Sequence, residues 1–137
     1  MTDTDSAKAQ AQAQLESIIE MVEALNKART DLENEVKGAD IAEENAIQAI
    51  DENPLCVSVR SDWHSPSDKP EPPEEYMILL CTGGPACRII GTLSEYFEPE
   101  TARIEYQDWG TPWTDYPLTS EQEAIVLEYA QQFYYGE

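Results

Sequence analysis

The sequence predicts an α+β protein with two N-terminal helices that could form a coiled coil, an antiparallel meander of three or four strands, and a C-terminal helix that covers the sheet. Residues 1–54 are rich in helix formers and carry apolar residues three and four positions apart. Residues 55–109 contain short segments in which apolar and polar residues alternate, and residues 118–133 have a helix-capping pattern followed by helical spacing. We therefore expect a helical extension over residues 1–54 and an α+β domain over residues 55–137.

The first helix is predicted from an apolar stripe that is interrupted at Arg29. Its members have the a/d spacing of about three heptads, and they are Leu15, Ile18, Val22, Leu25, Leu32 and Val36. Two interpretations stay open. The helix forms a homodimeric coiled coil through residues 11–36, or it folds back on the second helix or the sheet.

The ends of the helical extension are predicted from local composition. Residues 1–14 are rich in Ala and Gln, have little to bury and are expected to be frayed. Gly38 should end the first helix, because glycine favours the left-handed conformation found at helix ends. Asp40 and Glu43 have the spacing of a capping box for a second helix.

Four later segments are predicted to be strands. Residues 55–60 and 102–109 alternate apolar with polar residues, and residues 76–81 and 87–93 are the two most apolar runs of the chain and should pair as a hairpin. Gly83 and Gly84 provide the backbone freedom that a tight hairpin requires. The loop 61–75 contains four prolines, so it can be neither a helix nor a central strand. Thr119 or Ser120 is the expected N-cap of the terminal helix.

The charge of the chain limits its partners. Twenty-eight acidic and eight basic residues give a net charge of −20, and the excess is spread over both halves. Such a protein repels nucleic acid and anionic membrane surfaces, and it is attracted to basic protein surfaces. The acidic N-terminus lacks a secretory pattern and no apolar stretch is long enough for a membrane span, so we expect a cytoplasmic protein.

No group of residues has the pattern of a catalytic, metal or cofactor site. His64 is the single histidine, and no nucleophile motif accompanies it. Cys56, Cys81 and Cys87 lack the two-residue spacing of zinc knuckles and are better explained as small apolar strand residues. We therefore expect a protein that is not an enzyme and needs no metal or cofactor. A small ligand pocket formed by His64, Arg88 and the Trp-rich segment is a third, less favoured alternative.

Three segments carry a resemblance to known proteins. With TGGPACRIIG, IEYQDWGTPW and QQFYYGE, residues 55–137 resemble a family of small, uncharacterised acidic proteins carried by temperate phages, prophages and integrative elements of bacteria. The resemblance implies a mobile-element setting in a bacterial host cell, where small acidic proteins often block host defence. It implies no catalytic residue.

Two sets of residues are predicted to bind a partner. The acidic set could line one face of the helices, as a nucleic-acid mimic would require, and consists of Glu16, Glu20, Glu23, Asp31, Glu35, Glu43 and Glu44. The aromatic set consists of Trp109, Trp113 and Tyr116, residue types typical of interface hot spots, although a loop folded onto the sheet would explain them as well.

These residues predict a non-catalytic mobile-element accessory protein. It would bind a basic protein surface, for example that of a nucleic-acid-binding host defence complex, and inhibit it as an acidic mimic. The alternative is a structural or assembly module that oligomerises through its N-terminal helix and docks through the Trp-rich loop.

Overall fold

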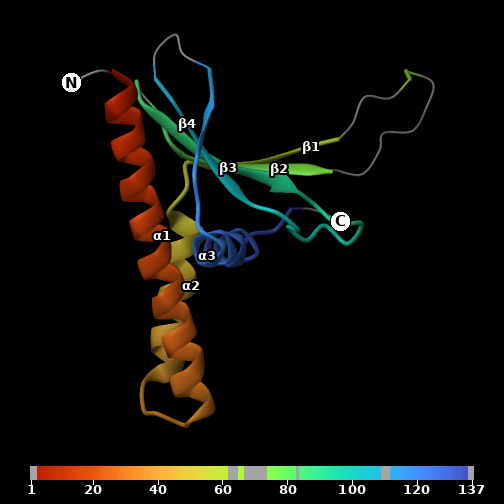
Figure 1. The fold of residues 1–137 in the computed structure, drawn as a ribbon. Helices are drawn as coiled ribbons and strands as arrows, with labels where there is room; N and C mark the ends of the chain where they lie inside the picture. Colours follow the sequence, from red (N-terminus) through yellow and green to blue (C-terminus); the bar gives the residue numbers. More distant parts are fainter. Residues whose placement is uncertain (1–2, 62–64, 67–73, 83, 109–111, 136–137) are drawn as a thin grey trace.

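The computed structural model describes residues 3–61, 65–66, 74–82, 84–108 and 112–135, and it confirms the α+β class (Figure 1). Two N-terminal helices precede the sheet and one helix follows it. The helices are α1 (Asp3–Glu33), α2 (Ala39–Glu52) and α3 (Ser120–Ala130). The strands are β1 (Cys56–Arg60), β2 (Glu75–Cys81), β3 (Ala86–Thr92), β4 (Arg103–Gln107) and β5 (Thr114–Tyr116).

The sheet is an open meander in which every strand pairs antiparallel with its sequence neighbours, in the order β1-β2-β3-β4-β5. The predicted count of three or four strands is wrong, because β5 lies in the segment that was expected to be a loop. This strand has only three residues and lies between Pro112 and Pro117, so no alternation marks it in the sequence. Its pairing with β4 places Tyr116 opposite Ile104.

One face of the sheet is buried by the helices, and the other face is open. Ile78, Ile89 and Ile104 are register partners across three strands and are fully buried. They belong to one apolar cluster with residues of α1, α2 and α3, among them Ile18 and Val126. Side chains of successive strand residues point to opposite faces, so the residues between these positions lie on the open face.

The N-terminal part of α1 is integrated into this core. The prediction that residues 1–14 are frayed is wrong for the described residues from Asp3 onward, because the helix begins there and both Ala7 and Ala11 are fully buried. Residues 1–2 lie outside the described residues. Ala7 and Ala11 continue the stripe of Leu15 in steps of four residues, which places all three on one side of the helix. Helices α1 and α2 therefore share a core with the sheet.

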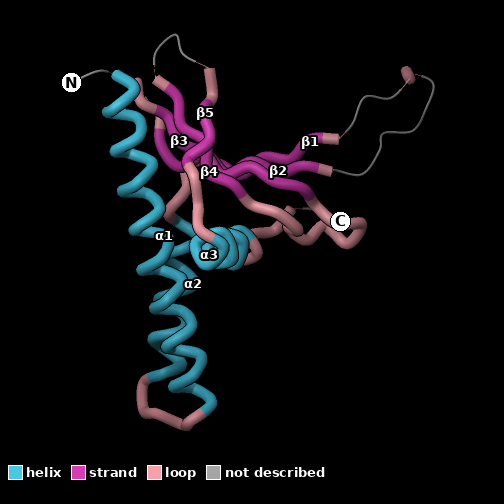
Figure 2. The backbone as a smooth tube through the Cα atoms, viewed as in Figure 1, coloured by secondary structure: helices cyan, strands magenta, loops and turns pink. Residues whose placement is uncertain are grey.

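The apolar stripe of α1 packs within the chain. Leu15, Ile18, Val22 and Leu25 are at most 3% exposed, whereas Leu32 and Val36 near the turn to α2 are 42% and 49% exposed. Figure 2 shows the two helices running together past the sheet to this turn. A coiled-coil dimer through residues 11–36 would have to use side chains that the core already buries.

The turn between α1 and α2 differs from the prediction at both helix ends. α1 ends at Glu33, Glu35 just after it is in the left-handed region at φ 58°, and the N–H of Val36 donates to the carbonyl of Asp31 at 2.8 Å. Gly38, at φ 83°, is the N-cap of α2 and no side chain caps this helix. The predicted capping box of Asp40 and Glu43 is therefore wrong, because Asp40 already lies in the first helical turn.

The start of α3 confirms the predicted cap. The Thr119 hydroxyl accepts from the N–H of Gln122 at 3.1 Å, and the Gln122 side chain accepts from the N–H of Thr119 at 3.0 Å. This arrangement satisfies two amides that a helix start otherwise leaves without a partner.

Candidate protein-binding surface

The outward side of α1 carries a row of acidic side chains. Glu16, Glu20 and Glu23 follow each other at four and three residues, which keeps them within about 60° of arc on one side of a helix. The buried stripe occupies the opposite side, and all three glutamates are exposed. No ion pair between described residues involves them, and Glu16 accepts only a 3.5 Å hydrogen bond from the neutral Gln12 side chain.

The charge density of this row can be compared with that of DNA. A helix rises 1.5 Å per residue, so Glu16 to Glu23 covers about 10 Å. Its three carboxylates are therefore about 5 Å apart along the axis, whereas the phosphates of one strand of B-DNA are about 3.4 Å apart. The row has about two-thirds of the line charge of one strand, and a duplex would need a second row beside it.

The other predicted acidic residues do not extend this row as free charges. Asp31 pairs with Lys27 at 2.7 Å, and Glu43 of α2 pairs with Arg29 of α1 at 3.5 Å. Glu35 and Glu44 are exposed near the turn between the helices. The seven acidic residues therefore form a free row of three, two ion-paired residues and two at the turn.

The aromatic set does not form a single patch. Trp109 lies outside the described residues. Trp113 is half-buried on the open face, with the Arg88 guanidinium 4.0 Å from the centre of its ring. Tyr116 faces the helices and packs edge-on against Tyr106, with ring centres 6.4 Å apart. Trp113 and Tyr116 thus lie on opposite faces of the sheet.

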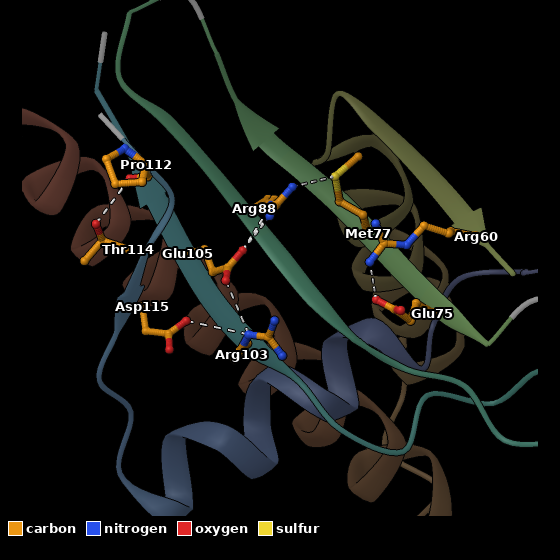
Figure 3. Close-up of polar contacts among 9 residues, drawn as sticks. All are labelled: Arg60, Glu75, Met77, Arg88, Arg103, Glu105, Pro112, Thr114 and Asp115. Atoms are coloured by element: carbon orange, nitrogen blue, oxygen red, sulfur yellow. Dashed lines mark hydrogen bonds and ion pairs between the residues drawn. The ribbon is translucent and has the colours of Figure 1, made fainter. Parts of the chain in front are cut away.

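The open face holds a network of ion pairs that the sequence did not predict (Figure 3). Three of the four arginines lie there, each beside a carboxylate. Arg88 pairs with Glu105 at 2.7 Å, and Arg103 lies 3.4 Å from Glu105 and 3.6 Å from Asp115. On the same face, near the β1 edge, Arg60 pairs with Glu75 at 2.6 Å. The open face is therefore balanced in charge, unlike the outward side of α1.

The cysteines are placed as strand residues. Cys81 and Cys87 are register partners at the end of the β2–β3 hairpin, and Cys56 is exposed on β1. Burial raises the pKa of the Cys87 thiol to about 12, with a smaller contribution from Cys81, and burial also raises the pKa of Cys81. Such thiols are poor nucleophiles near neutral pH. His64 lies outside the described residues, and no three His, Cys, Asp or Glu side chains within the described ranges are grouped to hold a metal ion.

No helix in the described part of the chain has both the length and the apolar character to cross a membrane. Comparison of the chain with protein-family models, with curated proteins and with solved structures found no match.

Proposed function

We propose that this protein is a non-catalytic accessory protein of a bacterial mobile element, and that the outward side of α1 binds a basic, nucleic-acid-binding surface of another protein. The observation that carries the proposal is the row of Glu16, Glu20 and Glu23, which is exposed and free of ion pairs with described residues. The mobile-element setting, and with it action in the bacterial cytoplasm, rests on the resemblance of residues 55–137. A host defence complex is the class of target that this setting favours.

The distribution of charge supports a basic partner at this surface. Of the seven basic residues that the structure describes, five are in ion pairs, and they are Lys27, Arg29, Arg60, Arg88 and Arg103. At physiological ionic strength, screening acts over about 8 Å, so neighbouring carboxylates on α1 act together on a bound partner. Their line charge approaches that of one strand of DNA, which is why a nucleic-acid-binding site is the expected target.

The alternative of an assembly module is less favoured. Self-association through residues 11–36 would use Leu15, Ile18, Val22 and Leu25, all of which the chain buries in its own core. A partner that binds the acidic row leaves these four side chains in the core.

Two triple variants test the proposal. In the first, Glu16, Glu20 and Glu23 are replaced by Gln. In the second, the matched control, Glu95, Glu98 and Glu100 of the β3–β4 connection are replaced by Gln, which removes the same charge from three other exposed positions. Each protein and the wild type are used as bait in host lysate at about 50 mM and about 500 mM salt, with and without excess duplex DNA.

We expect the wild type and the control to retain a nucleic-acid-binding protein that high salt and duplex DNA both release. The α1 variant should lose it at low salt, because its contact row is gone. A partner that is retained equally by all three baits, or that resists salt and DNA, would contradict the proposal.

A further inference from the structure

Within the described part of the chain, the strand β1 is an edge of the sheet that lacks the usual protection. An edge strand exposes unpaired N–H and C=O groups, and proteins commonly shield these with short length, proline or charge. The opposite edge is shielded in this way, because β5 has three residues, contains Asp115 and lies between two prolines. β1 has five residues, Cys-Val-Ser-Val-Arg, with no proline and with its one charge at the end.

β1 is also poorly covered on its helix side. Val57 and Val59 are its two residues on that side, and Val57 is only half-buried. Val59 is 43% exposed, and Leu55, which precedes the strand, is 59% exposed. Apolar side chains on an unshielded edge are typical of strands that pair with another chain.

On the open face, a groove begins at the same edge. It has a volume of about 180 Å³ and is lined by residues of β1, β2 and β3, among them Ser58, Arg60, Met77, Arg88 and Ile90. Ser58, which has the smallest side chain of β1, is the register partner of Met77. It therefore lies between the outer edge of the sheet and the apolar side chains of Met77 and Ile90 in the groove. An apolar cavity of about 150 Å³ can hold benzene. The groove is therefore large enough for one leucine-sized side chain.

We infer that β1 binds an extended segment of a partner protein, which adds to the sheet as a sixth strand. Opposite Ser58 the segment places a long apolar side chain, which enters the groove over Met77. Opposite Arg60 it places a carboxylate. The Arg60 side chain is 70% exposed and only one of its nitrogens contacts Glu75, so other N–H donors remain for this carboxylate. Apolar residues of the segment cover Val57 and Val59 on the helix side.

A second copy of this chain fits the edge less well. In antiparallel pairing, residues that face each other lie on the same face of the sheet. β1 places Cys56, Ser58 and Arg60 on the open face, and none of them is a long apolar side chain that would fill the groove. The inference does not depend on the acidic row of α1.

The test is a titration of the isotope-labelled full chain with a synthetic peptide that contains Glu-Val-Leu-Val-Thr, followed by amide chemical shifts. Paired antiparallel with β1, as the strands of this sheet are with one another, the peptide places Glu opposite Arg60 and Leu opposite Ser58. One control peptide replaces Leu by Ala, and another replaces Glu by Lys. A Ser58→Tyr variant fills the entrance to the groove, and Thr30→Tyr, at an exposed position of α1, is its matched control. The amide spectrum of each variant reports whether it has folded.

We expect the shifts to concentrate on β1 and around Met77. The Leu-to-Ala peptide should bind about tenfold more weakly, because it loses most of the apolar area in the groove. The Glu-to-Lys peptide should also bind more weakly. Ser58→Tyr should weaken binding and Thr30→Tyr should not. If Ser58→Tyr does not fold, the peptide series alone decides.

Three results would overturn the inference. They are no binding at about 1 mM peptide, equal binding of the Leu and Ala peptides, and shifts that map to another surface. Shifts of β1 amides that depend on protein concentration without peptide would overturn it as well, because they would show that a second copy occupies the edge.

Discussion

Replacement of Gly91 by alanine should destabilise the protein for a purely steric reason. A Cβ atom at this position would lie 2.0 Å from the carbonyl oxygen of Thr101 and 2.8 Å from the Cε1 atom of Tyr76. The Thr101 carbonyl cannot easily retreat, because it accepts a 2.6 Å hydrogen bond from the Tyr76 hydroxyl. Tyr76 itself is 1% exposed. The strand β3 must therefore move away from the segment before β4 by about 1.4 Å to restore an ordinary contact.

The expected cost follows from the rigidity of this region. Overpacking a core costs about 1–3 kcal/mol, and a clash with hydrogen-bonded backbone belongs at the upper end, so we expect about 3 kcal/mol for Gly91→Ala. For a chain of this length the loss corresponds to about 10 °C in Tm. Thermal and urea unfolding followed by circular dichroism measure both quantities.

Gly38 provides a matched control for the same substitution. It has φ 83° and nothing within 4 Å of an added Cβ, so Gly38→Ala introduces backbone strain without a clash. We expect a loss of about 1 kcal/mol. If Gly91→Ala were as stable as the wild type, or less destabilising than Gly38→Ala, the steric argument would be refuted.

Three further predictions concern single side chains. Glu105→Gln removes the carboxylate that pairs with Arg88, and since these side chains are only 11% and 20% exposed, it should lower the unfolding free energy by about 2 kcal/mol; urea unfolding that matches the wild type would contradict this. Thr119→Ala removes the α3 cap and should cost about 1 kcal/mol; no shift in the urea midpoint would mean that the cap is not formed. At pH 8, Cys56 should react first with a thiol reagent, whereas Cys87, with its pKa raised to about 12, stays protonated and should react last; equal rates in the folded protein would show that Cys87 is not protected.

Much of the secondary structure could be predicted because its signals are local. The spacing of Leu15, Ile18, Val22 and Leu25 identifies the buried side of α1 without reference to any other element. The cap of α3 depends on residues within one turn. β1 and β4 were predicted from alternation, which reflects burial on one face. β2 and β3 were predicted from two apolar runs that flank the glycines of a hairpin turn.

The features that were missed depend on neighbours in space. Ala7 and Ala11 are buried by the rest of the core and not by their own size, so composition alone gave the wrong prediction of a frayed start. β5 is too short to show a period, and only its pairing with β4 identifies it. The contact of Arg88 with Glu105 and Trp113 depends on strand register, which alternation does not specify.

The candidate binding surface could be predicted only in part, because some of its ion pairs also depend on neighbours in space. Helical spacing alone places Glu16, Glu20 and Glu23 on one side of α1. The pair of Lys27 and Asp31 could have been foreseen, since residues four apart on a helix are neighbours. The pair of Arg29 and Glu43 could not, because it depends on how α2 packs beside α1.

The most direct test of the central claim is the salt dependence of binding to the captured partner. Kd is measured from about 50 to about 500 mM salt for the wild type and for the variant in which Glu16, Glu20 and Glu23 are replaced by Gln. We predict that Kd rises steeply with salt for the wild type, and that the variant binds more weakly at low salt with a shallower slope. The same Kd and the same slope for both proteins would contradict the claim that the outward side of α1 binds a basic surface.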